Sequence, residues 1–389
     1  AQIAMRFHAG QPRTVVGITG TNGKTSVARF TQQIWSGLGH RAGTLGTLGA
    51  FAPGYEYALR HTTPDPVEIH QILSTMATMG TTHLAMEVSS HGLSQYRADG
   101  VQFSHVAFTN ITQDHLDYHA DFDEYLQAKC RLLSELLPEQ GTAVINMDGP
   151  GSERAASHAR AAGRNVFTVG RNGQDIVLHD LRPTKHGLAL RVSSGTITKS
   201  LELPLIGAFQ ADNALVAAGL CMVTGGAIEE VFDQLANLSA APGRMQFAGM
   251  RSFAEGGQAT AYVDFAHTPD AIETALAAIR PHTEGKVHIV FGAGGDRDRA
   301  KRPLMAEAAM RGAEKVVITD DNPRTEDAAA IRNEVQKGAP SALDVAGRRE
   351  AIQEGISGLE PGDVLLVAGK GHEQGQTIGT VTYPFDDVE

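Results

Sequence analysis

Val15-Val16-Gly17-Ile18-Thr19-Gly20-Thr21-Asn22-Gly23-Lys24-Thr25-Ser26 is the stretch that decides the fold class. β-Branched apolar residues lead into a glycine-rich turn, and Lys-Thr then opens a stretch with apolar residues at helical spacing. The N–H groups of such a turn, the positive helix end and a lysine hold phosphate, and a threonine hydroxyl there suits Mg²⁺. The match to G-x-x-x-x-G-K-[ST] is incomplete, because Ile18 stands where the first glycine belongs. The strand–turn–helix context still predicts a phosphate-binding loop, with an ordinary glycine-rich turn as the alternative.

Composition limits the class of protein. The 389 residues predict two or three domains. A net charge of −11 without any basic run argues against nucleic-acid binding. Cys130 and Cys221 are the only cysteines, so we expect no disulfide framework and a cytoplasmic location. No apolar run approaches the roughly 18 residues that a membrane span needs.

Strand-like and helix-like stretches alternate along the chain. From residue 14 to about 238 this alternation predicts a mostly parallel sheet covered by helices, with a small antiparallel excursion at 175–205. Residues 239–243 form the best linker candidate, and a second βα series follows them. We therefore predict an α/β protein: a P-loop domain over residues 1–241, and a Rossmann-like, doubly wound domain over residues 242–389.

Polar side chains gather where predicted strands of the first domain end, which is where ligands bind in such folds. Glu87 ends one strand and is placed to hold Mg²⁺, unless it only caps a loop or pairs with a lysine. Residues 110–119, after the next strand, contain two histidines and two aspartates within a short span, which predicts either a metal site or a hydrogen-bonded turn.

Lys129 lies in the apolar stripe of a helix predicted over residues 122–137. One interpretation is a lysine whose amine reaches water along its stem. The other is a desolvated amine with a lowered pKa, which can react with CO₂ to form a carbamate, an anionic metal ligand.

Three strand ends of the second domain carry acids, arginines and glycines, at residues 292–299, 319–324 and 369–373. Carboxylates bind ammonium and arginine binds carboxylate, so the three loops together predict a site for a zwitterion.

These motifs together resemble the Mur ligases, and the resemblance covers nearly the whole chain. The motifs of the central domain of that family are matched by residues 20–26, 87–93, 114–119 and 128–129. Those of its C-terminal domain are matched by residues 264–270, 321–324 and 369–373. Family members carry an N-terminal domain that binds the uridine end of the substrate; almost nothing precedes the phosphate loop here, so we expect this chain to lack it.

The resemblance implies an ATP-dependent amide ligase of peptidoglycan synthesis that acts through an acyl phosphate. It is nearest to the branch that adds meso-diaminopimelate to UDP-N-acetylmuramoyl-L-alanyl-D-glutamate, because Arg324 can bind the distal carboxylate that lysine lacks. A lysine-adding or folylpolyglutamate-type ligase is the alternative within the family, and a P-loop ATPase without ligation is the alternative outside it. We expect a monomer with no nucleic-acid partner and no membrane span.

The resemblance also assigns roles to individual residues. Those expected to bind ATP are Gly20, Thr21, Asn22, Gly23, Lys24, Thr25, Ser26, Asn213, Arg244, Asp264 and His267. Those expected to hold the UDP-muramoyl dipeptide are Thr62, Thr63, Ser89, Gln95 and Arg97. Those expected to hold meso-diaminopimelate are Arg297, Asp321, Asn322, Pro323, Arg324, Gly369 and Glu373. Two Mg²⁺ ions are expected on Thr25, Glu87, His115 and carbamylated Lys129, and the catalytic set is Lys24, Glu87, His115 and Lys129.

Overall fold

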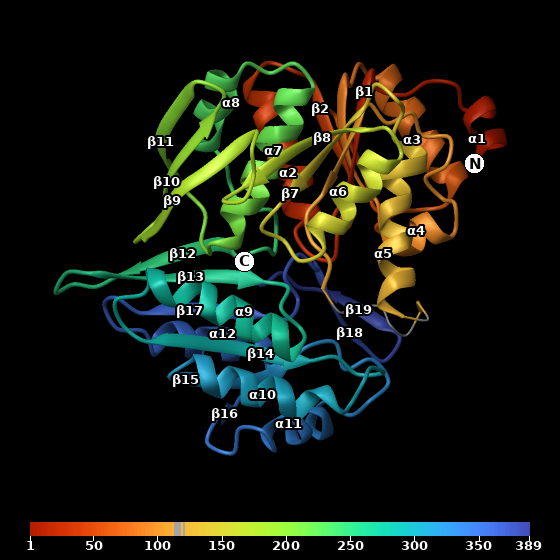
Figure 1. The fold of residues 1–389 in the computed structure, drawn as a ribbon. Coiled ribbons are helices and arrows are strands. Elements are labelled where there is room, and N and C mark those ends of the chain that lie inside the picture. The colour runs from red at the N-terminus through yellow and green to blue at the C-terminus, as the bar shows by residue number, and fades with distance from the viewer. Residues whose placement is uncertain (113–117, 120) are drawn as a thin grey trace. The chain divides into compact units, whose positions relative to one another are not determined.

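The computed structural model describes residues 1–112, 118–119 and 121–389, and it contains two compact units (Figure 1). Unit 1 comprises residues 1–182, 188–204 and 208–239. Unit 2 comprises residues 183–187, 205–207 and 240–389. A domain boundary between residues 241 and 242 stays a prediction.

Unit 1 is built on an 11-stranded sheet with the order β11-β10-β9-β8-β7-β6-β1-β5-β2-β3-β4. Its strands are β1 (Thr14–Thr19), β2 (Ala42–Gly46), β3 (Gly49–Ala52), β4 (Tyr55–Tyr57), β5 (His83–Glu87), β6 (His105–Phe108), β7 (Thr142–Asn146), β8 (Asn165–Gly170), β9 (Ile176–Thr184), β10 (Gly187–Ser194) and β11 (Ile197–Leu203). The central strands from β8 to β2 run parallel, as predicted. Antiparallel pairs occur toward the edges, at β10–β11 as the excursion predicts and at β2–β3 and β3–β4, which the sequence pattern did not indicate.

Helices cover both faces of this sheet (Figure 1). They are α1 (Gln2–Phe7), α2 (Lys24–Gly37), α3 (Pro66–Thr78), α4 (Ser90–Ser94), α5 (Phe122–Arg131), α6 (Ser152–Ala161), α7 (Phe209–Val223) and α8 (Ile228–Leu235). One apolar core joins α3, α5 and α6 to the sheet, while α2 packs against α7. No helix in the described part of the chain is long and apolar enough to cross a membrane.

The helix predicted over residues 122–137 is correct only in its first part. The α-helix α5 ends at Arg131, and a π-helical turn, η1 (Leu132–Leu136), continues it. Leu137 N–H donates to the carbonyl oxygen of Leu132, five residues back, at 3.2 Å. Leu132 and Leu133 are both buried, as their positions three and four residues after Lys129 in the apolar stripe predict, whereas the change to a wider turn was not predicted.

Unit 2 contains a six-stranded sheet with the order β12-β13-β17-β14-β15-β16 and a separate hairpin, β18–β19. The strands are β12 (Gln246–Ser252), β13 (Gln258–Asp264), β14 (Val287–Ala293), β15 (Lys315–Asp320), β16 (Leu343–Asp344), β17 (Val364–Ala368), β18 (Gly375–Ile378) and β19 (Val381–Pro384). The helices are α9 (Pro269–Ile279), the 3₁₀ turn η2 (Arg280–His282), α10 (Lys301–Gly312), α11 (Ala328–Gln336) and α12 (Arg348–Ser357). The five predicted parallel strands are present, whereas the antiparallel edge strand β12 and the hairpin were not predicted.

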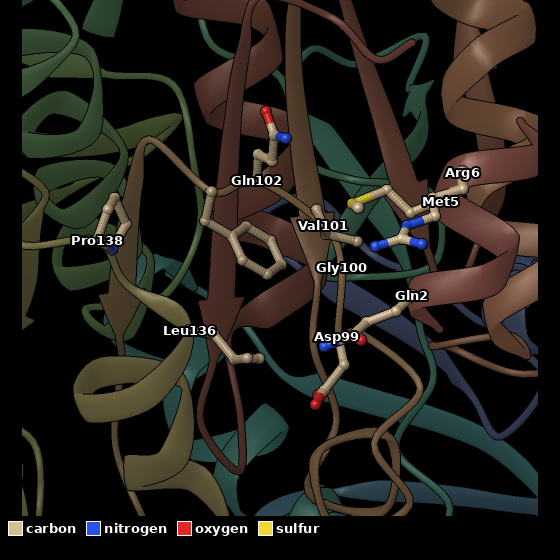
Figure 2. Close-up of a pocket in the computed structure, with 10 residues that line it drawn as sticks. Gln2, Met5, Arg6, Asp99, Gly100, Val101, Gln102, Leu136 and Pro138 are labelled. Atoms are coloured by element: carbon tan, nitrogen blue, oxygen red, sulfur yellow. The ribbon is translucent and has the colours of Figure 1, made fainter. Parts of the chain in front are cut away.

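A cavity of about 770 Å³ lies in unit 1 between α1 and the segment 99–103 (Figure 2). That segment leads into the amino end of β6, whereas the glycine-rich loop follows the carboxyl end of the parallel neighbour β1. The cavity therefore lies at the opposite end of the strands from the predicted phosphate site.

Asp212, in the first turn of α7, provides a test of the folding energetics. Burial, together with the Asp148 carboxylate, raises the pKa of Asp212 from 3.8 to about 6. Burial therefore makes the ionised Asp212 carboxylate destabilise the folded protein. This loss of folding stability is complete when the pH exceeds the folded-state pKa, and it disappears when the pH falls below the unfolded-state pKa. We expect Asp212→Asn to raise the urea midpoint at about pH 8, with a gain that shrinks toward zero at about pH 4.

The exposed Asp123→Asn is the matched control and should leave the midpoint unchanged at both pH values. An equal gain from Asp212→Asn at both pH values would contradict the burial of a charged carboxylate.

Candidate functional site

The glycine-rich loop between β1 and α2 has a backbone that only glycine fits. Gly20 has φ 148° and Gly23 has φ 87°, both in the region that side chains avoid. A Cβ on Gly20 would lie 1.9 Å from Thr109 Oγ1, and one on Gly23 would lie 2.3 Å from Asn213 Oδ1. Both positions therefore require glycine. The loop leads directly into the start of α2, where backbone N–H groups form the arrangement that holds a phosphate.

Two lysines converge on this loop. Lys24 Nζ donates to the carbonyl oxygens of Gly20 and Thr21, each at 2.9 Å. Lys129 Nζ, from α5, donates to the same Gly20 oxygen at 2.8 Å and lies 4.5 Å from the ring centroid of Tyr125. Lys129 is 1% exposed, so the interpretation in which its amine reaches water is wrong.

Glu87, at the end of β5, is the centre of a buried hydrogen-bond network. Its carboxylate accepts from the Thr25 hydroxyl at 2.9 Å, from the Thr47 N–H at 2.9 Å and from the Thr47 hydroxyl at 3.1 Å. A Cβ on Gly46 would lie 2.2 Å from Glu87 Oε1, so this position needs glycine. A hydroxyl and a carboxylate oxygen side by side are ligands that Mg²⁺ prefers, and the pair therefore fits the predicted ion.

The residues predicted to hold an acidic, hydroxyl-rich substrate adjoin this network. Thr62 Oγ1 lies 3.0 Å from Thr47 Oγ1, and Thr63 Oγ1 donates to the Glu87 carbonyl oxygen at 3.2 Å. Ser89 N–H donates back to Thr63 Oγ1 at 2.9 Å. Hydroxyl groups therefore continue from the predicted ion site along one edge of the sheet.

Arg97 and Gln95 extend the same edge. Arg97 Nη1 donates to the Thr63 carbonyl oxygen at 2.9 Å, and its Nε donates to Gln95 Oε1 at 2.9 Å. Gln95 Nε2 in turn donates to the Tyr118 hydroxyl at 3.0 Å. The structure thus brings all five of these predicted residues of unit 1 together.

The structure describes the other predicted site residues of unit 1, with the exception of His115. Asn22 N–H donates to Asn110 Oδ1 at 3.1 Å, Ser26 is buried in the first turn of α2, and Asn213 Nδ2 donates to Gln210 Oε1 at 3.1 Å. His115 lies outside the described residues. Within the described ranges, no group of three or more His, Cys, Asp or Glu side chains is arranged to hold a metal ion.

In unit 2, the predicted nucleotide residues lie where β13 ends. The Asp264 carboxylate accepts from two backbone N–H groups at 2.7 and 2.9 Å, and burial raises its pKa against the nearby charge of Arg244. The Arg244 guanidinium lies 4.8 Å from the ring centroid of Phe265. Burial lowers the pKa of His267, and burial near Arg244 lowers that of His372 to about 4, so both rings are neutral at physiological pH.

Polar side chains at the ends of β15 and β17 form one cluster. Asn322 Nδ2 donates to Glu373 Oε2 at 2.8 Å, and the buried Lys370 Nζ donates to Asn322 Oδ1 at 3.0 Å. A Cβ on Gly369, at φ 114°, would lie 2.9 Å from Asp321 Oδ2. The structure therefore brings the predicted residues of these two loops together, with Lys370 as a member that we did not predict.

Arg324 joins this cluster to the loop after β14. Its Nη1 donates to the Gly295 carbonyl oxygen at 2.7 Å, and a Cβ on Gly295 would lie 1.8 Å from the Pro323 oxygen. Arg324 has φ 51°, a left-handed conformation that costs about 1–3 kcal/mol in a residue other than glycine. Arg297, on the same loop as Gly295, is exposed.

Two site residues were missed by the sequence reasoning. Thr47 follows the buried strand β2, and Lys370 follows the buried strand β17, so both stand at strand ends like the residues that were predicted. Neither carries a carboxylate or a guanidinium. Lys370 lies within the segment 369–373 that we singled out, but its bond to Asn322, like that of Thr47 to Glu87, joins residues distant in sequence, and the sequence pattern did not predict it.

Thr47 offers a direct test of the Glu87 network. Thr47→Val keeps the shape and the backbone N–H but removes the hydroxyl donor, whereas Thr47→Ser keeps the donor. Residues that orient a metal ligand contribute on the order of 10–100-fold to affinity, so we expect Thr47→Val to weaken Mn²⁺ binding in the presence of ATP by about tenfold. Electron paramagnetic resonance of the free ion measures this; an unchanged affinity in Thr47→Val, or an equal loss in Thr47→Ser, would contradict the role.

Known proteins resemble this chain along nearly its full length. The profile of the Mur ligase middle domain matches residues 18–221, and that of the Mur ligase, glutamate ligase domain matches residues 243–371. A protein of Agrobacterium fabrum named UDP-N-acetylmuramoyl-L-alanyl-D-glutamate–2,6-diaminopimelate ligase is 49% identical over 386 residues, 99% of this chain and 78% of that protein. A protein of the same name from Brucella melitensis is 50% identical over 384 residues, 99% of this chain and 78% of that protein.

Solved structures agree with this likeness. A structure of a ligase of that name is 34% identical, with a TM-score of 0.72, and the match covers 99% of this chain and 78% of that one. Mycobacterium tuberculosis folylpolyglutamate synthase, solved with ADP and AMPPCP, has a TM-score of 0.72 at 19% identity, covering 94% of this chain and 91% of that one. The second likeness concerns the fold alone. On the two matching domains and the near-half identity along the chain, this protein belongs to the Mur ligase family.

Proposed function

We propose that this protein is the ATP-dependent ligase that adds meso-diaminopimelate to UDP-N-acetylmuramoyl-L-alanyl-D-glutamate in peptidoglycan synthesis. One observation carries the proposal: relatives with that name are about half identical over nearly the whole chain. The network around Glu87 and the cluster around Arg324 support it, because they supply an ion site and a carboxylate-binding site.

The reaction needs an activated carboxylate. An oxygen of the D-glutamyl side-chain carboxylate attacks the γ-phosphorus of ATP, and the bond to ADP breaks. The amine of diaminopimelate then attacks the acyl carbon, phosphate leaves with its bridging oxygen, and the nitrogen loses a proton. Lys24 and the N–H groups at the start of α2 would hold the phosphates and offset the charge that develops on them.

Two oxygen atoms that could bind Mg²⁺, the Thr25 hydroxyl and a Glu87 carboxylate oxygen, already lie side by side. Thr25 and Glu87 would hold one Mg²⁺, which supplies charge neutralisation between ATP and the carboxylate when it is bound. Lys129 carbamylated by CO₂, with His115, would serve a second ion. Two features support the carbamate: Lys129 is buried, and it shares the Gly20 oxygen with a second amine, Lys24.

The substrate roles follow the clusters of the two units. Thr62, Thr63, Ser89, Gln95 and Arg97 would bind the muramoyl dipeptide. Asn213, Arg244, Asp264 and His267 would contact the nucleotide. Asp321, Asn322, Gly369 and Glu373 would hold the amino-acid end of diaminopimelate, with Pro323 and Arg297 beside them.

Arg324 would select the amine. A guanidinium has five N–H donors, and its Nη1 uses one on Gly295, so a fork toward a carboxylate remains available. L-Lysine lacks that carboxylate, which separates this proposal from the lysine-adding alternative. The proposal includes a cytoplasmic location, which the two free cysteines support, and a monomeric state.

The amine dependence tests the function. ADP release by the full gene product should require both the UDP-muramoyl dipeptide and meso-diaminopimelate, with little release when L-lysine replaces the latter. Arg324→Gln leaves a carboxylate unpaired, which costs about 1–3 kcal/mol, so kcat/KM for meso-diaminopimelate should fall by about 10–100-fold.

Arg311→Ala, at an exposed arginine of α10, is the matched control and should behave as the wild type. Release that is indifferent to the amine would favour an ATPase and overturn the ligase. Equal use of lysine by the wild type would assign the chain to the lysine-adding branch.

The carbamate has its own test. Lys129→Ala should lose most activity and recover part of it when a short carboxylic acid such as acetate or propionate is added, because the added carboxylate can replace the carbamate oxygens. Lys199→Ala, at a partly exposed lysine, is the control. Full activity of Lys129→Ala without additive would exclude the carbamate, and circular dichroism checks that the variant is folded.

A further inference from the structure

Two loops of unit 2 are joined edge to edge: residues 294–296 after β14, and residues 322–326 after β15. We call them the paired loops. Gly295 N–H donates to the Asn322 carbonyl oxygen at 2.9 Å, and Arg324 Nη1 donates back to the Gly295 oxygen at 2.7 Å. The Asp296 carboxylate accepts from the Thr325 N–H at 3.2 Å and from the Thr325 hydroxyl at 2.6 Å. The position of the Arg324 guanidinium therefore depends on both loops.

Both loops hold a strained residue. Asp296 has φ 53° and Arg324 has φ 51°, and neither is a glycine. Such conformations persist only where the surroundings fix them. The backbone of Arg324 is fixed on one side by the hairpin, since its N–H donates to Thr377 at 3.0 Å and its carbonyl oxygen accepts from Gly379 N–H at 2.7 Å.

Arg302, on α10, contacts both paired loops through its guanidinium. It is fully buried, and its Nη2 and Nη1 donate to Glu326 Oε1 and Oε2 at 2.7 and 3.0 Å. Nη2 also donates to the Gly294 carbonyl oxygen at 3.2 Å. Glu326 Oε1 accepts in addition from the Asp296 N–H at 2.6 Å. One guanidinium thus contacts both paired loops, the first at the Gly294 oxygen and the second at the Glu326 carboxylate.

Two carboxylates balance the positive charge of the Arg302 guanidinium. Arg302 Nη1 donates to Glu334 as well, at 2.8 Å, so two carboxylates face the buried cation. Arg302 and the Asp296 N–H lower the pKa of Glu326 to about 2, which keeps the fork ionised. A lysine would keep the charge but not the planar fork that bridges two loops.

We propose that Arg302 is a positioning residue that holds the paired loops in register and thereby aims the Arg324 guanidinium at the distal carboxylate of the incoming amine. Because Arg302 is fully buried, we infer that it acts through its contacts to Glu326 and Gly294, and through Glu326 on Asp296. The specificity part of this inference rests on the proposed function, whereas the coupling of the loops does not.

The test uses Arg302→Lys and Glu326→Gln in the full gene product, with Arg311→Lys as matched control. Arg311 lies on the same helix, α10, and also pairs with a carboxylate, that of Glu273, but its side chain is 59% exposed and it makes none of the contacts of Arg302 to the paired loops. We expect both test variants to raise KM for meso-diaminopimelate by about tenfold or more, with kcat and KM for ATP within about threefold of the wild type. Arg311→Lys should match the wild type.

Hydrogen exchange supplies a readout without substrate. Amides of residues 294–296 and 322–326 should exchange faster in Arg302→Lys and Glu326→Gln than in the wild type or in Arg311→Lys. Unchanged exchange, or a uniform loss in kcat and in both KM values, would overturn the inference. If Arg302→Lys does not fold, Glu326→Gln decides, because it preserves the shape of the side chain.

The two proposals fail differently. A wild type without diaminopimelate-dependent ADP release would overturn the proposed function and the specificity part with it. An active wild type whose Arg302→Lys and Glu326→Gln variants keep its KM for meso-diaminopimelate would overturn the positioning role alone.

Discussion

The carbonyl oxygen of Gly20 accepts hydrogen bonds from two lysine amines, Lys24 and Lys129. This shared oxygen ties the end of β1 to α2 and α5, so the glycine-rich loop is fixed from both sides. The absence of a Cβ at Gly20 makes the contact possible, because Thr109 occupies that space. A buried cation is costly unless it is paired or hydrogen-bonded, and the loop carbonyl supplies that bond. The phosphate loop and the buried lysine therefore form one structural element.

Unit 2 uses the same principle with other residues. Arg302, Arg348 and Lys370 are all fully buried, and each donates to acids or carbonyl groups where strands end. Arg348 pairs with the buried Asp387 at 2.6 Å and contacts the end of β17 through the Ala368 oxygen at 3.0 Å. Removing one partner of such a pair leaves a buried charge uncompensated, so each of these cations stabilises the strand ends that it contacts.

The sequence pattern predicted the parts that depend on local order. Buried parallel strands appear as apolar runs. Polar residues at their carboxyl ends cluster within each unit, Glu87 with Thr25 in unit 1 and Asn322 with Glu373 in unit 2, because parallel strands end at one edge of a sheet. Lys129 stood out because a cation in an apolar stripe is unusual. These signals predicted the fold class and most of the residues that cluster in each unit.

The parts that failed depend on contacts between distant segments. Thr47 and Arg302 look ordinary in sequence, and their roles arise only from Glu87 and from the paired loops. The edge strand β12 lacks a strong alternation, and the strands of the hairpin β18–β19 have only four residues each. The apolar stripe of α5 continues through the π turn at Leu132 and Leu133, so it does not indicate where the α-helix ends. His115 lies outside the described residues, so its predicted role stays a prediction.

The central claim is that the protein joins an amine to a carboxylate by way of an acyl phosphate. The most direct measurement follows a heavy-oxygen label in the D-glutamyl side-chain carboxylate of the UDP-muramoyl dipeptide, during turnover with ATP and meso-diaminopimelate. Mass spectrometry of the released phosphate should find one labelled oxygen for each amide formed, because the carboxylate oxygen leaves with phosphorus. Phosphate without label, with its new oxygen taken from water, would contradict the account.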